Sequence, residues 1–165
     1  MNKYPIVGYG SLLSHSSLRE TIKDKRFQKI LVKGYKRIFN LIDGKTDILN
    51  LEKSKTDHFN AILFYVNDEE LKKLKLREDE YNLEKVDVFD FTTKEKISEA
   101  YISIDYIIDI DSGKKQPNKE YFTLCRSAAY ELGNDFGKYW DETTYTSSNE
   151  KITNWIKKNK EYDKL

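Results

Sequence analysis

The chain has 165 residues, with 29 lysines and arginines against 28 aspartates and glutamates, two histidines and one cysteine. This length predicts one domain over residues 1–165, because a single core of this size can bury about two thirds of the surface of the unfolded chain. The net charge of +1 excludes the uniform basic field of a protein that wraps nucleic acid. One cysteine cannot form an internal disulfide, and together with two histidines it cannot form a Cys/His zinc cluster.

The amino-terminal segment, MNKYPIVGYGSLL, lacks a long apolar stretch and becomes rich in glycine almost at once, unlike a signal peptide. No stretch approaches the roughly 18 apolar residues of a membrane span. We therefore expect a cytoplasmic protein that has no membrane partner and no nucleic-acid partner. Hydrophobic residues make up 38% of the chain and aromatic residues 13%, which predicts a folded core.

The first part of the sequence is mostly strand-like. Apolar, β-branched and aromatic runs predict strands over residues 5–9, 29–40, 47–51 and 60–66. The first strand stops at Gly10 and Ser11, which is typical of a buried strand that leads into a loop. Asp43 and Gly44 form a hairpin turn signal between the second strand and the third.

The middle of the sequence predicts a short helix and a hairpin. Asn67, with Glu70 three positions later, makes a capping box, so we expect a helix that ends near Arg77. Alternating residues then predict two strands, over 86–91 and 101–110, with a charged turn between them.

The last third predicts the longest helix, after a polar, turn-rich loop over residues 111–117. Its apolar stripe consists of Tyr121, Leu124, Cys125, Ala128, Ala129 and Leu132. Gly133 supplies the C-cap. Ser147 and Glu150 predict a second capping box and a final short helix. Five to seven strands with about three helices indicate an α+β domain on a small closed or strongly curled mixed β-barrel, flanked by helices.

The sequence offers little support for a nucleophilic triad. The helical spacing places Cys125 in the core, where a free thiol is usually inert packing. His15 lies in a serine-rich loop, and His58 precedes a strand without a partner in the sequence pattern. The glycine loop over residues 8–12 could turn its backbone amides toward an anion or an oxyanion. By spacing alone, an ordinary turn at the end of a strand is the better interpretation.

The residues Tyr9-Gly10-Ser11-Leu12 resemble the YGS(N/L) loop of the γ-glutamylcyclotransferase-like family. The resemblance extends from about Tyr4 to Trp155. Four further segments are similar to the family patterns "V.GYRR.FN", "G.LF.V", "L..L...E...Y....V" and "PS..Y", and they lie at residues 33–40, 60–66, 71–88 and 116–121. Five segments in order, at plausible spacings, carry the resemblance.

This family includes γ-glutamylcyclotransferases, γ-glutamylamine cyclotransferases and ChaC-type enzymes that degrade glutathione. The resemblance implies an enzyme that converts a γ-glutamyl amino acid or amine to 5-oxoproline and the free amine, with no metal and no organic cofactor. Glu78 matches the catalytic glutamate, which acts as general acid and base, and Glu80 is the second candidate. The resemblance implies substrate-binding roles for Gly8, Tyr9, Gly10, Ser11, Leu12 and Tyr121. The helical stripe alone would make Tyr121 a core aromatic.

The sequence also departs from the family patterns. The spacing from Glu78 to Tyr81 is shorter than in several relatives, and Asn118 or a neighbour replaces the usual serine. Asn60 and Ala61 replace the glycine that precedes the "LF" strand. These departures leave a second hypothesis, a protein of the same fold that binds a small molecule or a partner without turnover. The expected partner is a small γ-glutamyl molecule, and the expected state is a monomer or a homodimer.

Overall fold

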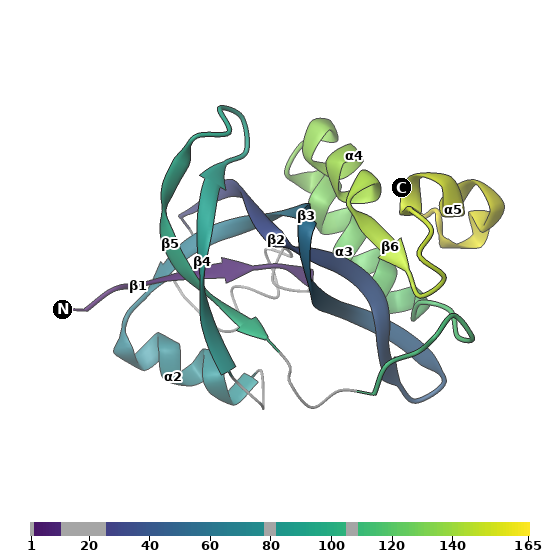
Figure 1. Ribbon diagram of the computed structural model, residues 1–165, viewed down its shortest axis with the longest axis horizontal. Helices are drawn as coiled ribbons and strands as arrows, with labels where there is room; N and C mark the ends of the chain where they lie inside the picture. Colours follow the sequence, from purple (N-terminus) through teal and green to yellow (C-terminus); the bar gives the residue numbers. More distant parts are fainter. Residues whose placement is uncertain (1, 11–25, 78–81, 105–108) are drawn as a thin grey trace. The chain divides into compact units, whose positions relative to one another are not determined.

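The structure is a computed structural model, and it describes residues 2–10, 26–77, 82–104 and 109–165. The strands in this part of the chain are β1 (Tyr4–Gly8), β2 (Phe27–Asp43), β3 (Thr46–Val66), β4 (Asn82–Asp90), β5 (Lys96–Ile104) and β6 (Thr144–Thr146) (Figure 1). The α-helices are α2 (Asp68–Arg77), α3 (Lys119–Glu131), α4 (Asn134–Glu142) and α5 (Ile152–Lys158), and the short 3₁₀ helix η2 covers Lys160–Tyr162. No helix in these ranges is both long and apolar enough to cross a lipid bilayer.

The strands are hydrogen-bonded in the order β3-β1-β5-β4-β2-β6, and β3 also pairs with β2. Five strands therefore form a closed β-barrel, and β6 is added to it beside β2. The barrel is mixed, because β1 runs parallel to β5 and antiparallel to β3. This arrangement confirms the α+β class and the closed mixed barrel that the sequence predicts.

The described residues group into two compact units, and neither unit is a continuous piece of chain. The first unit takes its residues from Met1–Lys33 and Asn60–Tyr106, and the second from Gly34–Phe59 and Ile107–Leu165. Both β2 and β3 pass from one unit into the other. The expectation of one domain over the whole chain stays a prediction.

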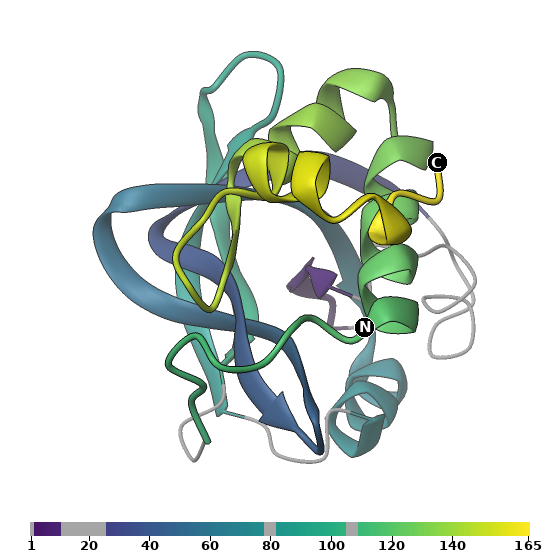
Figure 2. The same ribbon diagram turned by 90° about the vertical axis from the view of Figure 1, so that its right-hand side faces the viewer.

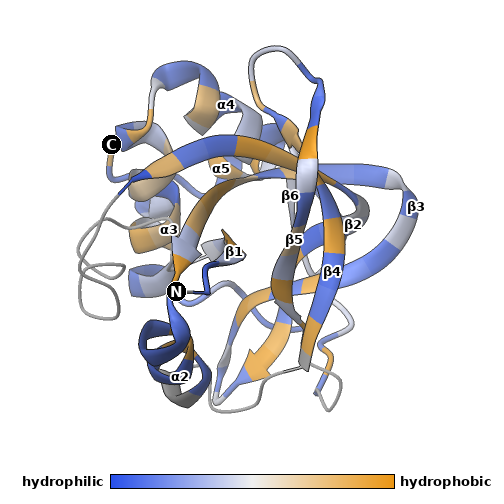
Figure 3. Cartoon of the chain, turned by 90° about the vertical axis from the view of Figure 1, so that its left-hand side faces the viewer, coloured by the Kyte–Doolittle hydropathy of each residue, from blue (hydrophilic) through white to orange (hydrophobic). Residues whose placement is uncertain are grey.

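The first unit is built from strand pairs whose inner faces are apolar. β1 pairs with β3 from Tyr4 opposite Val66 to Gly8 opposite Ile62. Hydrophobic and hydrophilic residues alternate along β4 and β5, as Figure 3 shows, because successive side chains of a strand point to opposite faces. The capping box predicted before α2 is confirmed: the amide of Asn67 donates to Glu70 Oε1 at 3.0 Å, and the amide of Glu70 donates to Asn67 Oδ1 at 2.8 Å.

The second unit has a core of aromatic rings. The Phe122 ring on α3 is central, with ring centroids 5.5 Å from Phe39, 5.8 Å from Trp140, 5.6 Å from Trp155 and 5.3 Å from Tyr162. These rings come from β2, α3, α4, α5 and η2, so one cluster joins the helices of this unit to its strands (Figure 2). Such pairs add to the burial of apolar area because aromatic rings favour tilted and edge-on contacts.

The structure corrects the prediction for β3, which is one strand of 21 residues rather than two short ones. The sequence indicated an interruption because residues 52–58 are mostly polar. These side chains are half-buried or exposed, while the backbone keeps its strand conformation within β3, which pairs with β2. Backbone pairing needs no apolar side chains, so an exposed stretch can remain in the ladder. β5 begins at Lys96 rather than at residue 101, and residues 105–108 of that predicted strand lie outside the described residues.

The carboxyl-terminal region differs most from the sequence prediction. The structure contains α4 and β6, which the sequence pattern did not predict. The capping box predicted at Ser147 and Glu150 is wrong, because α5 begins after Lys151. Instead, the amide of Thr146 donates to Glu150 O at 2.9 Å across a turn, in which Asn149 has a φ of 67°.

In α3, Cys125 is fully buried as predicted, whereas Leu124 is 41% exposed and lies off the buried stripe. Gly133 marks the end of this helix as expected, because it follows the C-cap residue Leu132 with a φ of 129°. A side chain at that φ would be strained, so glycine allows the chain to turn directly into α4.

Candidate functional site

The glycine loop begins where β1 ends, in the first unit. Gly8 is buried and pairs with Ile62, Tyr9 is half-buried, and Gly10 is buried with a φ of 62°. This φ lies in the left-handed region, which a glycine adopts without the steric cost of a Cβ. The backbone therefore favours a glycine at position 10. Because glycine has no side chain, no Cβ covers its backbone amide. Ser11 and Leu12 lie outside the described residues.

The two candidate bases, Glu78 and Glu80, also lie outside the described residues, as does His15. The described chain ends on one side at Arg77, the last residue of α2, and resumes at Asn82, the first residue of β4. Both glutamates therefore belong to the short connection between a helix and a strand of the first unit.

Tyr121 belongs to the second unit, in the first turn of α3. Its amide donates to Asn118 Oδ1 at 2.9 Å, so Asn118, which stands near the usual family serine, is the N-cap of this helix. The ring meets the Phe39 ring edge-on, with centroids 6.2 Å apart, and the side chain is half-buried. Tyr121 thus combines a contact with the aromatic core and partial access to solvent.

The thiol of Cys125 is inert packing, as the sequence predicts. Burial raises its pKa to about 12, although a hydrogen bond with Tyr121 and the charge of Arg37 act in the opposite direction. A thiol with this pKa is almost fully protonated near neutral pH, and the thiolate is the reactive form.

Arg37 is a fully buried cation on β2, and neither the sequence motifs nor the family resemblance indicated a role for it. Its Nε donates to Thr144 Oγ1 at 2.8 Å, and its Nη2 donates to Thr143 Oγ1 at 3.1 Å. The guanidinium carbon lies 5.4 Å from the ring centroid of Phe59 and 5.3 Å from that of Trp140. Burial lowers the Arg37 pKa to about 9, because a charge that leaves water loses its hydration.

One signal in the sequence could have found this arginine. Tyr35, Arg37 and Phe39 alternate along β2, and all three are buried. An arginine between two aromatic residues at a spacing of two is therefore predicted to share their inward face. Its partners Thr143 and Thr144 could not be found in this way, because they lie more than 100 residues away in the sequence.

The charge of Arg37 also acts on two tyrosines and the thiol, and we call Arg37, Tyr121, Cys125 and Tyr139 the Arg37 cluster. The Tyr139 hydroxyl bonds to Nδ1 of His58, a partner that the sequence pattern did not reveal. Burial raises the Tyr139 pKa, and Arg37 acts in the opposite direction. The cluster places a fixed positive charge beside phenol groups, an arrangement that stabilises negative charge on its neighbours.

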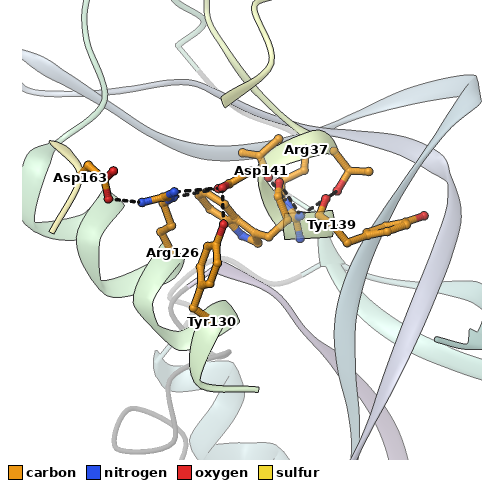
Figure 4. Close-up of polar contacts among 9 residues, drawn as sticks. Arg37, Arg126, Tyr130, Tyr139, Asp141 and Asp163 are labelled. Carbon is orange, nitrogen blue, oxygen red and sulfur yellow. Dashed lines mark hydrogen bonds and ion pairs between the residues drawn. The ribbon is translucent and has the colours of Figure 1, made fainter. Parts of the chain in front are cut away.

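A second buried arginine connects three elements of the same unit (Figure 4). Arg126 on α3 donates to both carboxylate oxygens of Asp141 on α4, at 2.9 Å and 3.0 Å. It also donates to Asp163, after η2, at 2.9 Å, and the Tyr130 hydroxyl donates to Asp141 at 2.7 Å. Because Asp141 is satisfied by three donors, this network is a structural anchor. Among the described residues, no group of three or more His, Cys, Asp or Glu side chains could hold a metal ion.

The comparisons with known proteins define the class of fold. No family model matches the sequence, and no curated protein does. Solved structures do match: the chain has the fold of γ-glutamyl cyclotransferases, as the sequence resemblance implies. A structure named gamma-glutamyl cyclotransferase is similar with a TM-score of 0.69 and 16% identity, over 99% of this chain and 100% of that one.

Two further structures have this fold. An uncharacterized protein from Homo sapiens is similar with a TM-score of 0.71 and 16% identity, over 96% of this chain and 98% of that one. A yeast γ-glutamyl cyclotransferase specific to glutathione is similar with a TM-score of 0.53 and 11% identity, over 100% of this chain and 89% of that one. At these identities the likeness shows the fold alone.

Proposed function

We propose that this protein is a cofactor-independent γ-glutamyl cyclotransferase, which converts a γ-glutamyl amino acid or amine to 5-oxoproline and the free amine. The observation that carries the proposal is the full-length fold match with a γ-glutamyl cyclotransferase. The YGSL loop after β1 supports it, because the φ of 62° at Gly10 is the backbone geometry for which a glycine is needed.

In the proposed reaction, the α-amine of the γ-glutamyl group attacks its own γ-carbonyl carbon. A carbon–nitrogen bond forms within the new five-membered ring, and the bond to the departing amine breaks. An α-ammonium has no free electron pair, so a base must take one proton before the attack, and the attacking nitrogen gives up a second proton as the ring closes. Both protons go to the departing nitrogen, which leaves as an ammonium. Glu78 is proposed to perform both transfers. Atoms and electrons balance without water, metal or redox partner.

The glycine loop is proposed to bind the substrate. Backbone amides near Gly10 and Ser11 can donate to the substrate carboxylate or to the oxyanion that develops on the γ-carbonyl oxygen. Holding the γ-glutamyl chain in its folded conformer would contribute much of the rate, because ring closure within one molecule depends on orientation. Tyr121 is proposed as a further substrate-binding residue.

The test is release of 5-oxoproline from a γ-glutamyl amino acid, a γ-glutamylamine and glutathione. We expect wild-type protein to release it from at least one of the three, and Glu78→Gln to lose about 100-fold or more of that rate, as expected for a missing general base. Glu80→Gln is the matched control, since it makes the same change two residues away, and we expect it to keep its activity.

The opposite pattern, with activity lost in Glu80→Gln and kept in Glu78→Gln, would move the base to Glu80. Binding of these compounds without 5-oxoproline from the wild-type protein would refute the enzyme and leave the non-catalytic binding protein. The shortened spacing between Glu78 and Tyr81 is the feature that favours this second function.

A further inference from the structure

Asp47 is a fully buried carboxyl group whose neighbour is a second carboxyl group. It lies at the start of β3, directly after the β2–β3 turn, and it is 0% exposed. As acceptors, neither of its carboxylate oxygens receives a hydrogen bond in the part of the chain that the structure describes. A second buried carboxyl, that of Asp111, lies beside it and is 5% exposed.

These two carboxyl groups meet where a loop crosses the β2–β3 hairpin of the second unit. This loop, residues 109–118, connects to the amino terminus of α3. Four backbone hydrogen bonds fasten it to the hairpin: Ile42 N to Asp109 O at 2.8 Å, Asp111 N to Asn40 O at 2.8 Å, Asp47 N to Gln116 O at 2.9 Å, and Asn118 N to Asp47 O at 2.8 Å. Asp47 therefore holds the carboxyl-terminal part of the loop with its backbone, while its side chain faces Asp111.

The Asp111 carboxylate is already well satisfied. It accepts the amide of Lys114 at 3.1 Å and that of Lys115 at 2.8 Å, so both lysines contribute backbone donors within the same loop. Besides Asp111, the groups that face Asp47 are Lys115 and the hydroxyl of Ser147, which follows β6. The Ser147 hydroxyl donates to Lys115 O at 3.3 Å.

Two ionised carboxylates cannot satisfy each other, because each one only accepts hydrogen bonds. If both were charged, Asp47 would be a buried anion beside a second anion, which is costly in a low dielectric. One proton removes this conflict, since a protonated carboxyl donates through its O–H to the remaining carboxylate.

We propose that Asp47 and Asp111 share one proton, and that this proton fastens loop 109–118 to the β2–β3 hairpin, so that the loop loosens when the proton is lost. The proton is bound to Asp47, whose O–H donates to the Asp111 carboxylate. Burial, followed by the hydrogen bond and the charge of Asp111, raises the Asp47 pKa to about 7. Burial also opposes ionisation of Asp111, but its hydrogen bonds with Asp47 and the two loop amides prevail and lower its pKa to about 2.

The two shifts have opposite effects on stability. The folded chain binds the Asp47 proton more tightly than the unfolded chain does, where an aspartate titrates near about 3.9. The contribution of Asp47 to the free energy of unfolding therefore falls as the pH rises from the unfolded value to about 7, and then stays constant. The contribution of Asp111 is present above the unfolded value and is lost as the pH falls toward about 2. The contribution of the pair is therefore largest near the unfolded value, at about pH 4.

The protonation of Asp47 affects α3, because loop 109–118 leads directly into this helix. Asn118, its last residue, is the N-cap of the helix and donates through its side chain to Thr46 Oγ1 at 3.3 Å. The side-chain oxygen of Asn118 accepts the amide of Tyr121. Loosening of the loop would free this cap from the hairpin and would reach the turn of helix that carries Tyr121.

Hydrogen exchange on the full-length chain tests the proposal without any substrate. After correction for the intrinsic effect of pH, we expect amides of loop 109–118 to exchange about tenfold faster at pH 8 than at pH 6, because the bound proton becomes about tenfold scarcer over this range. Asp47→Asn mimics the protonated state, so its loop should exchange at the same corrected rate at both values. Asp109→Asn, the same change at an exposed position of this loop, should behave as the wild type does.

A second variant keeps the test decisive if Asp47→Asn does not fold. In Asp111→Asn the new amide can donate to Asp47, but one of the two loop amides loses its acceptor. The loop should therefore exchange faster than in the wild type at pH 6, and at the same corrected rate at pH 8 as at pH 6. Wild-type exchange that does not depend on pH, or an unchanged pH dependence in both variants, would refute the shared proton. A melting temperature that Ca²⁺ or Mg²⁺ raises in the wild type and not in Asp47→Asn would also refute it, because the pair would then be a cation site.

Discussion

At the scale of single residues, the second unit stabilises a buried cation largely with neutral groups. Arg37 donates to two threonine hydroxyls and lies between the rings of Phe59 and Trp140. A guanidinium suits this place better than an ammonium would, because its donors are fixed in one plane and its flat faces can stack on rings.

We expect Arg37→Lys to lower the free energy of unfolding by about 2–4 kcal/mol, because lysine cannot reach both threonine hydroxyls and leaves buried acceptors unsatisfied. Urea denaturation followed by circular dichroism measures the loss. Arg26→Lys is the matched control at an exposed position, and we expect a change of less than about 0.5 kcal/mol there. Equal stability of the two variants would contradict the role assigned to the Arg37 guanidinium.

The residue scale also shows what single positions in the sequence can predict. The burial of Cys125 and the need for a glycine at position 10 follow from helical spacing and from the residue type at the end of a strand, which are local properties. The Arg37 cluster and the Asp47–Asp111 pair depend on contacts between residues distant in the sequence. No local pattern specifies these contacts, because tertiary folding brings them together.

At the scale of elements, α3 and α4 pack closely enough to require a glycine. A Cβ placed on Gly137 of α4 would lie 2.3 Å from the ring of Tyr130 on α3. This distance is far below van der Waals contact, so the ring occupies the space that a side chain would need.

Gly137→Ala should therefore destabilise the protein by about 1–3 kcal/mol through overpacking. Without that contact, the same substitution in a helix would stabilise by up to about 1 kcal/mol. A double-mutant cycle with Tyr130→Ala, measured by chemical denaturation, separates the two effects. In the background without the ring, Gly137→Ala should become neutral or stabilising, and an unchanged cost there would show that the ring is not the cause.

The Arg126 network makes a second prediction at this scale. Arg126→Met should cost about 3–5 kcal/mol, because it leaves Asp141 buried beside α3 without its cation. Asp163→Asn should cost less than about 1 kcal/mol, since that carboxylate is 47% exposed and solvent screens its charge. Thermal unfolding of both variants measures the difference, and similar losses would mean that the contact with Asp163 matters as much as the buried pair.

Element boundaries followed from the sequence where the signal was local and self-contained. The Asn67–Glu70 box is reciprocal in the structure, and it begins α2 as predicted. Ser147 and Glu150 have the same spacing, but they lie in a turn in which the Thr146 amide donates to Glu150 O. α5 begins only after this turn. α4 was missed because it has only nine residues, and two of its four buried residues, Gly137 and Asp141, are not hydrophobic types that reveal a buried helix face in a sequence.

At the scale of the whole molecule, the sequence was sufficient to predict a small mixed barrel with helices, because the strand runs and the resemblance to one family agree. It did not predict that β3 is continuous, since exposed strand positions look like a loop in composition. Nor could it show that the residues form two compact units, because each unit is assembled from separate stretches of chain. Only contacts across the sequence define such groupings.

This interleaving has a consequence for folding during synthesis. The described residues of the first unit all lie before position 107, so its pieces can assemble as soon as this part has left the ribosome. Residues 34–59 belong to the second unit and lack their partners until residues 107–165 have been made. At translation rates of about 5–20 residues per second, this wait lasts several seconds. We expect residues 34–59 to remain exposed during this time, and the polar residues 52–58 would help to keep them from aggregating.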